Sequence, residues 1–151
     1  MTVIAYRDGV MAGDTATSWG DDIRTFRKTK VFRFDIGGTI MLVGVSGESA
    51  SSQKFINWML AGMSPPPPEM TKGEDFVVLV VHDDGCIELW TEKMVPVATA
   101  ESYFAIGNGM GQALCAMDAG ATAEQAVGIT IRRHPGCGGE VTSVRFGDGA
   151  S

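Results

Sequence analysis

The chain has 151 residues, of which 44% are hydrophobic and 20% charged, a composition typical of one globular domain. Twelve Lys and Arg against eighteen Asp and Glu give a net charge of -6, which argues against a nucleic-acid partner held by phosphate contacts. The three cysteines are widely spaced without a Cys-x-x-Cys motif, so neither a disulfide framework nor a zinc site is predicted. The first residues lack the pattern of a signal peptide or membrane anchor. We therefore expect one domain over residues 1–151 in the reducing cytoplasm, with no metal, cofactor or membrane partner.

Two strand pairs are predicted at the start of the chain. Residues 3–6 and 10–14 are β-prone, and the Asp8-Gly9 dipeptide between them favours the positive φ angles of a two-residue type I′ turn. Residues 30–34 and 39–45 form the second pair, separated by a glycine-rich turn. Four strands are therefore expected before the first helix.

The middle of the chain changes to helical periodicity and then returns to strands. Apolar residues recur at intervals of three and four across residues 49–63, the spacing of one buried helix face. Consecutive prolines at residues 65–68 end that pattern and predict a stiff, extended loop. Residues 76–81 and 86–90 then predict another hairpin.

The last third of the chain predicts two helices between two strands. The expected elements are a strand at residues 103–106, helices at 110–119 and 123–133, and a strand at 140–146. Thr122 and Gln125 have the spacing of a capping box at the start of the second helix. Antiparallel strands that alternate with helices predict an α+β fold of stacked layers, in which helices cover the sheet faces.

The chemistry of Thr2 depends on whether Met1 is removed. An N-terminal threonine carries a free amine next to its own hydroxyl, and that amine can act as the base that activates the hydroxyl. An α-amine has an ordinary pKa of about 7.7 to 8.0, so a nearby cation can keep it neutral at cytoplasmic pH. Lys30 is the candidate cation and Asp14 the carboxylate that holds it. Taken alone, Lys30 also fits a solvated strand end and Asp14 a turn.

Three segments near the start of the chain carry a resemblance to a known family. They are Thr-Val-Ile-Ala at residues 2–5, Asp-Gly-Val-Met-Ala-Gly-Asp at 8–14 and Lys-Val at 30–31. In this order they resemble the start of proteasome β-type subunits, especially the bacterial HslV peptidase. The resemblance implies the four-layer α-β-β-α sandwich of N-terminal nucleophile hydrolases.

Further motifs extend this resemblance over nearly the whole chain. Gly-Val-Ser-Gly at residues 44–47 resembles the family segment in which a glycine amide forms the oxyanion hole, and the match assigns that role to Gly47. Gly-Asn-Gly at 107–109 resembles the family's Gly-Ser-Gly before a helix, and Gly-Gly at 138–139 its glycine pair before the last strand. The implied catalytic residues are Thr2, Asp14, Lys30, Gly47 and Asn108.

Some positions depart from the family pattern. Asn108 replaces a serine, and its amide can form hydrogen bonds but cannot relay a proton as a hydroxyl does. His134 and Cys137 stand where the family has an aspartate and a serine, and each fits either an accessory residue of the site or an ordinary loop residue. The resemblance also implies that Ser18 and Val45 bind substrate. Val45 suggests an apolar pocket, and Lys28 nearby complicates that inference.

The predicted hairpin does not by itself bring the Asp14 side chain to Thr2. A two-residue turn places Thr2 opposite Thr15 and Asp14 opposite Val3, so strand alternation directs Thr2 and Asp14 to opposite sheet faces. A bulge around Gly13, or a longer turn, would bring Asp14 back toward Thr2.

The resemblance implies a threonine endopeptidase that acts on peptides or unfolded proteins. It also implies a homo-oligomeric ring or double ring, and it raises an ATPase unfoldase as a further partner. Two rival hypotheses keep the fold and change the function: an inactive shell protein, marked by Asn108 and His134, and an amidase that acts on small molecules. The removal of Met1 and the cleavage specificity are left open at this point.

Overall fold

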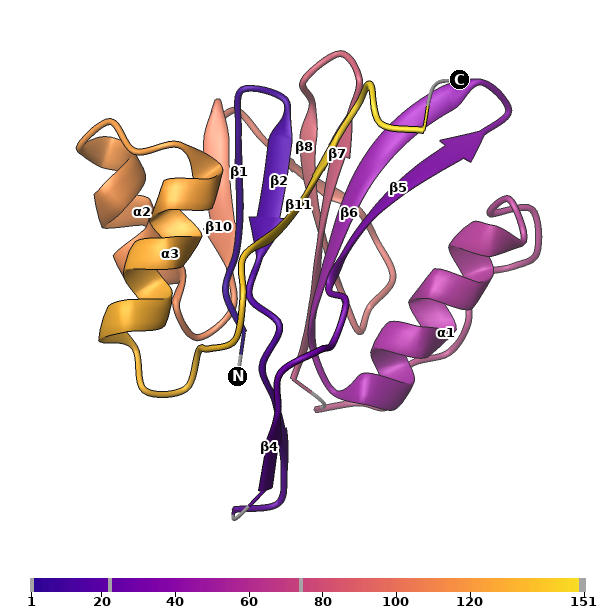
Figure 1. Ribbon diagram of the computed structural model, residues 1–151. Coiled ribbons are helices and arrows are strands. Elements are labelled where there is room, and N and C mark those ends of the chain that lie inside the picture. Colours follow the sequence, from indigo (N-terminus) through magenta and orange to yellow (C-terminus); the bar gives the residue numbers. More distant parts are fainter. Residues whose placement is uncertain (1, 22, 74, 150–151) are drawn as a thin grey trace.

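The computed structural model describes residues 2–21, 23–73 and 75–149, and it has an α+β fold (Figure 1). A 4-stranded antiparallel sheet, here the first sheet, consists in order of β10 (Tyr103–Ile106), β1 (Ile4–Arg7), β2 (Val10–Gly13) and β11 (Thr142–Arg145). A 5-stranded antiparallel sheet, the second sheet, consists in order of β5 (Val31–Ile36), β6 (Thr39–Gly47), β7 (Phe76–His82), β8 (Ile87–Thr91) and β9 (Val97–Thr99). A separate hairpin pairs β3 (Thr17–Trp19) with β4 (Ile23–Thr25). The helices are α1 (Ser49–Leu60), α2 (Met110–Asp118) and α3 (Ala123–Arg133).

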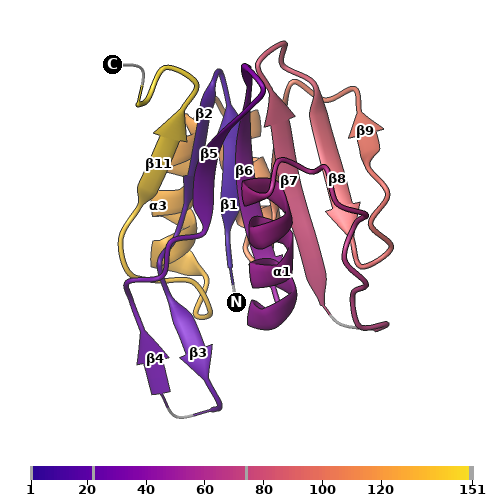
Figure 2. The ribbon, with the colours of Figure 1, turned by 90° about the vertical axis from the view of Figure 1, so that its right-hand side faces the viewer.

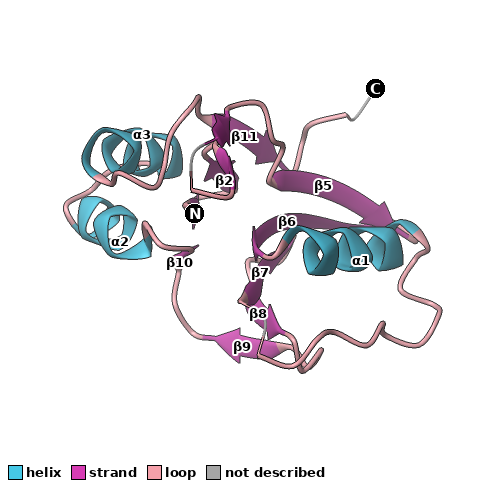
Figure 3. Cartoon of the chain, turned by 90° about the horizontal axis from the view of Figure 1, so that it is seen from below, coloured by secondary structure: helices cyan, strands magenta, loops and turns pink. Residues whose placement is uncertain are grey.

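The helices lie on the outer faces of the two sheets (Figures 1 and 3). Helices α2 and α3 contact β1 of the first sheet, whereas α1 contacts β5 and β6 of the second sheet. The sheets face each other between the helices, and β2 contacts both β5 and β6. The expectation that helices cover sheet faces is confirmed.

Strand β1 is buried on both faces, and its side chains alternate between two cores. Ile4 and Tyr6 pack between the sheets with residues such as Leu42 of β6, whereas Ala5 packs toward α2 and α3. The sheets approach closely at Gly44, where a Cβ atom would lie 2.6 Å from Ile4 Cγ2. A side chain at this position would therefore push β6 away from β1.

Most of the expected elements are present, with shifts of a few residues at their ends. Helix α1 ends at Leu60 rather than at residue 63, because Gly62 and Met63 adopt left-handed conformations with φ angles of 80° and 57°. The capping box of α3 is confirmed: the Gln125 amide donates to Thr122 Oγ1 at 3.1 Å, and the Thr122 amide donates to Gln125 Oε1 at 2.9 Å.

The expectation of four strands before the first helix is wrong, because β3 and β4 also precede α1. Strand β9 was likewise not predicted. Each of these strands has only 3 residues, and most of those residues are exposed, so none shows an alternating buried pattern. The β3–β4 hairpin projects from the end of the two sheets (Figure 2).

The hairpin between β1 and β2 has the two-residue turn that the sequence predicts. Asp8 and Gly9 have φ angles of 50° and 79°, and pairing runs without a break from Arg7 opposite Val10 to Ile4 opposite Gly13. This paired segment contains no bulge at Gly13, so a bulge is not what brings Asp14 toward Thr2.

Candidate active site

Three buried polar side chains meet where β1 begins. Lys30 Nζ donates to Asp14 Oδ1 at 2.8 Å and to Thr2 Oγ1 at 3.3 Å. Thr2 is 7% exposed, Asp14 0% and Lys30 3%. Burying charges without such pairing would cost far more free energy than the fold could supply. The structure therefore brings together the three residues that the sequence suggests as candidate nucleophile, cation and carboxylate.

Asp14 follows β2 and reaches the site without a bulge. Its Oδ1 accepts a hydrogen bond from the Val3 amide at 3.2 Å, and its Oδ2 accepts one from the Gly138 amide at 3.1 Å. The Asp14 amide donates in turn to the Val3 carbonyl at 3.2 Å. Regular pairing stops at Gly13, and beyond it the Val3 amide donates to the Asp14 side chain, which holds the carboxylate next to the start of β1.

The backbone of Thr2 is held by the segment before α2. The Gly109 amide donates to the Thr2 carbonyl at 3.1 Å. Gly107 has a φ of +95°, and a Cβ atom there would lie 2.2 Å from the same carbonyl oxygen. Only glycine allows this close approach. The two glycines that flank Asn108 therefore position Thr2, a role that sequence reasoning did not assign to them.

Burial governs the protonation of two groups at the site. Burial lowers the pKa of Lys30, while the Asp14 carboxylate acts in the opposite direction. Burial raises the pKa of the Cys137 thiol to about 11, and the charge of Asp14 adds to this effect. Cys137 is therefore protonated at neutral pH, a state in which a thiol is a poor nucleophile.

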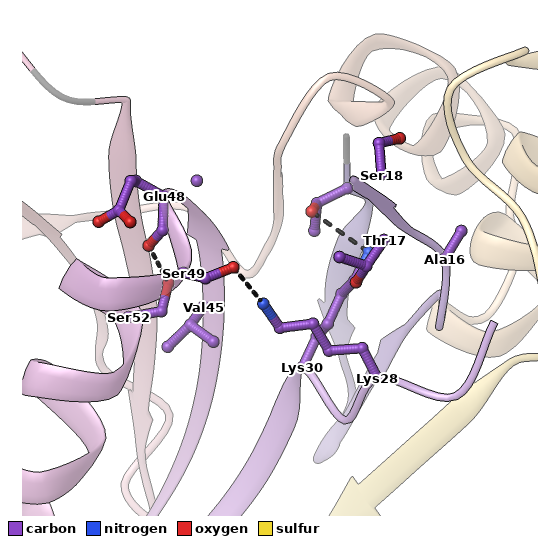
Figure 4. Close-up of a pocket in the computed structure, with 11 residues that line it drawn as sticks. Ala16, Thr17, Ser18, Lys28, Lys30, Val45, Glu48, Ser49 and Ser52 are labelled. Atoms are coloured by element: carbon purple, nitrogen blue, oxygen red, sulfur yellow. Dashed lines mark hydrogen bonds between the residues drawn. The ribbon is translucent and has the colours of Figure 1, made fainter. Parts of the chain in front are cut away.

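Thr2 opens onto a cavity of about 260 Å³, here called the Thr2 cavity (Figure 4). Ser18, Val45 and Gly47, which the sequence assigns to substrate binding and the oxyanion hole, all line it. Gly47 ends β6 with a φ of +109°, and a Cβ atom there would lie 1.7 Å from the Asp75 carbonyl oxygen. The backbone at this position consequently requires glycine.

Three other predicted residues lie outside the Thr2 cavity. Asn108 is exposed and lines a different cavity of about 240 Å³. His134 is the C-cap of α3, and its Nδ1 accepts a hydrogen bond from the Gly136 amide at 3.0 Å. Cys137 packs with Val3 in the core beneath α2 and α3, close to the site but facing the interior.

The Thr2 cavity also contains residues without a role in the motif match. Lys28, Glu48 and Ser49 line it, and sequence reasoning flagged only Lys28 as lying close. Glu48 is the N-cap of α1, where its side chain accepts from the Ala50 and Ser51 amides. An acidic residue directly before a helical pattern is the signal that could have placed it.

Residues 2–21, 23–73 and 75–149 contain neither a candidate metal cluster nor a candidate membrane-spanning helix. No cluster of three or more His, Cys, Asp or Glu side chains suited to a metal ion occurs within those ranges. None of the helices described there has the length and apolar character needed to cross a membrane.

Comparison with known proteins identifies the fold. The sequence matches neither a protein-family profile nor a curated protein. The structure is similar to "Thiobacillus denitrificans BPH", with 19% identity, a TM-score of 0.67, and coverage of 96% of this chain and 97% of that chain. It is also similar to eukaryotic HslV from Trypanosoma brucei, with 13% identity, a TM-score of 0.69, and coverage of 95% and 97%.

A third similar structure is a Gly-1 mutant of Anbu from Hyphomicrobium sp. strain MC1. It is 14% identical, with a TM-score of 0.70, over 97% of this chain and 81% of that chain. At these identities the likeness establishes a proteasome-like fold shared with HslV and Anbu, and the chemistry has to be argued from the side chains.

Proposed function

We propose that this chain is a threonine peptidase whose nucleophile is Thr2 after removal of Met1, a residue outside those the structure describes. The observation that carries the proposal is the Lys30 ammonium, which bridges Asp14 at 2.8 Å and Thr2 Oγ1 at 3.3 Å in a buried setting. A fixed positive charge beside the nucleophile disfavours protonation of the Thr2 amine and stabilises negative charge on Oγ1. Asp14 holds that charge in place.

The reaction proceeds through an ester of Thr2. The Thr2 hydroxyl oxygen attacks the peptide carbonyl carbon, and the α-amine takes the hydroxyl proton. The Gly47 amide donates a hydrogen bond to the resulting oxyanion. When the carbon–nitrogen bond breaks, the proton on the amine passes to the leaving nitrogen. Water then attacks the ester, and the amine transfers the water proton to Thr2 as the acid product leaves.

The proposal extends to architecture and assembly. It describes residues 1–151 as one domain with the four-layer α-β-β-α sandwich of N-terminal nucleophile hydrolases, in a cytoplasmic homo-oligomer that degrades peptides or unfolded proteins. Two structural neighbours support this proposal. One is the helical assembly of the Anbu complex from Pseudomonas aeruginosa, which supports an oligomer, and the other is Thiobacillus denitrificans BPH in complex with epoxomicin. An ATPase that delivers unfolded chains is the corresponding partner.

The test combines intact-mass measurement with a threonine-directed probe. We expect the purified protein to lack Met1 and to gain the mass of one peptide epoxyketone per chain, because this probe reacts with both the hydroxyl and the free amine of an N-terminal threonine. Thr2→Ala is expected to abolish labelling and peptide hydrolysis, whereas Thr39→Ala, at an exposed position on β6, retains both. Retention of Met1, or full activity of Thr2→Ala, would contradict the mechanism.

The same experiment separates the rival functions. A processed protein that neither labels nor hydrolyses any substrate is an inactive shell. A protein that labels and hydrolyses simple amides, but not peptides of several residues, is a small-molecule amidase.

A further inference from the structure

The Thr2 cavity is lined by a lysine that forms a hydrogen bond with a neutral hydroxyl group. Lys28 Nζ donates to Ser49 Oγ at 2.9 Å, and Figure 4 shows the two side chains reaching toward each other, with Val45 beside them. Both residues line the Thr2 cavity. Among the described residues, no acidic side chain forms an ion pair with Lys28. The Lys28 charge is thus available to a ligand in the cavity.

The carboxylates of Asp14 and Glu48 are already engaged. Asp14 is paired with Lys30 and receives the Val3 and Gly138 amides. Glu48 Oε1 and Oε2 accept from the Ala50 and Ser51 amides at 2.8 and 2.7 Å, and these hydrogen bonds lower the pKa of Glu48. The Glu48 charge is directed at the positive end of α1, which offsets it. Lys28 and Lys30 both line the Thr2 cavity, and of the two only Lys30 forms an ion pair within the part of the chain that the structure describes.

The cavity lining also includes a buried hydroxyl group whose hydrogen bonding is not satisfied. Thr17 Oγ1 is buried and lacks a hydrogen-bond partner within the part of the chain that the structure describes, and Thr17 lines the Thr2 cavity. A buried hydroxyl without a partner costs free energy, which an incoming acceptor group would recover. Ser18 and Ser49 supply further hydroxyls to the cavity. This lining suits a polar, negatively charged side chain better than an apolar one.

We propose that the Thr2 cavity selects peptides with an acidic side chain, Glu or Asp, on the residue whose carbonyl Thr2 attacks. Lys28 binds the carboxylate of that side chain, with the Ser49 hydroxyl as a second donor, while Val45 contacts its methylene groups. This inference rests on the proposed peptidase function and adds its substrate class. It also revises the expectation of an apolar pocket based on Val45 alone.

The test compares peptides that differ at one residue. Four substrates carry Glu, Gln, Leu or Lys before a fluorogenic amide, so Glu and Gln differ in charge but hardly in shape. A charge-assisted hydrogen bond predicts that kcat/KM is about tenfold or more higher for Glu than for Gln. We also expect this ratio to fall as salt is added, because Lys28 is only partly buried.

Variants of Lys28 assign the preference to this side chain. Lys28→Met keeps a long stem without the charge, and we expect the Glu-to-Gln ratio to fall close to one. Lys28→Glu is expected to favour the Lys substrate, and Lys28→Arg to retain the preference for Glu. Lys93→Met removes an exposed lysine beyond β8 and serves as the matched control that keeps the wild-type ratio.

The possible failures point to different conclusions. Hydrolysis that favours Leu, or a Glu-to-Gln ratio unchanged in Lys28→Met, overturns the acidic preference and leaves the peptidase intact. If the processed wild-type protein hydrolyses none of the four substrates and no epoxyketone labels Thr2, the peptidase function itself is overturned, and the preference with it.

Discussion

The Asp14 carboxylate joins three separate segments of the chain. It accepts from the Val3 amide, the Gly138 amide and the Lys30 ammonium, and it is fully buried. A buried ion pair contributes little net stability compared with apolar packing, but removing one partner leaves the other charge without compensation. At the scale of single residues, the candidate site is therefore most sensitive to this one side chain.

Asp14→Asn tests that sensitivity. The substitution keeps the shape of the side chain and removes the charge, so we expect the free energy of unfolding to fall by about 3 to 5 kcal/mol and peptidase activity to be lost. Urea denaturation and the fluorogenic assay measure the two effects. The matched control is Asp35→Asn, at an exposed position near the end of β5, where Asp35 Oδ1 accepts from the Gly38 amide at 3.0 Å. Equal denaturation midpoints for the two variants would contradict the prediction.

The pH dependence expected of the proposed activity follows from Lys30. Burial lowers its pKa, so the ammonium loses its proton at a lower pH than an ordinary lysine does. We expect kcat/KM to rise as the Thr2 amine deprotonates and to fall again as Lys30 deprotonates, with the falling limb below the ordinary lysine pKa of 10.5. Rates of epoxyketone labelling across the pH range measure both limbs. A rate that stays constant up to pH 10.5 would show that the Lys30 charge is not needed.

At the scale of elements, the site lies at the ends of strands and at the start of a helix. Thr2 precedes β1, Asp14 follows β2, and Lys30 precedes β5. The backbone at these ends is fixed by local contacts, such as the hydrogen bond from the Val45 amide to the Lys30 carbonyl at 3.0 Å. Strand ends are free of regular pairing, so their side chains can turn toward one another in ways that alternation forbids inside a sheet.

Gly107→Ala tests the contact between the turn before α2 and Thr2, the proposed nucleophile. A Cβ atom at Gly107 would lie 2.2 Å from the Thr2 carbonyl, so the added methyl group is expected to displace Thr2 and to lower both activity and stability. Gly111→Ala makes the same chemical change inside α2, where nothing lies within 4 Å of the new atom. We expect that control to keep activity and to gain about 0.5 to 1 kcal/mol of stability. Thermal denaturation and the peptidase assay check both outcomes.

At the scale of the whole molecule, the chain has a net charge of -6 but carries an apolar projection. The β3–β4 hairpin extends beyond the two sheets (Figure 2), and Trp19, Ile23 and Phe26 on or beside it are 62%, 61% and 48% exposed. The base of the hairpin also lines the Thr2 cavity through Thr17 and Ser18. Grouped exposed apolar side chains are typical of contacts between proteins. This hairpin is the part of the chain best suited to contact another copy in the proposed oligomer.

Light scattering in solution tests the assembly. We expect the wild-type protein to have a mass several times that of the 16.0 kDa chain, and the double substitution Trp19→Ser with Ile23→Ser to shift it toward 16.0 kDa. Leu60→Ser is the control, because Leu60 is 69% exposed at the end of α1 and is not part of the hairpin. A measured mass of 16.0 kDa for the wild-type protein would reject an obligate ring.

The sequence by itself determined the features that depend on local pattern. The turn at Asp8-Gly9, the capping box of α3 and the main strands and helices follow from periodicity and turn chemistry, and they are found in the structure. The short exposed strands β3, β4 and β9 were missed because three residues hold too little periodicity to detect. Motif resemblance also named Thr2, Asp14 and Lys30 as one candidate site.

Only the tertiary structure decided how these residues meet. Local alternation directs Asp14 away from Thr2, and the two are joined through Lys30 because pairing ends at Gly13 and the Gly138 amide binds the carboxylate from the far end of the chain. The tertiary structure likewise placed Lys28 opposite Ser49, 21 residues later in the chain. Contacts between distant segments depend on how sheets and helices pack, and this packing is not encoded in the spacing of residues along one segment.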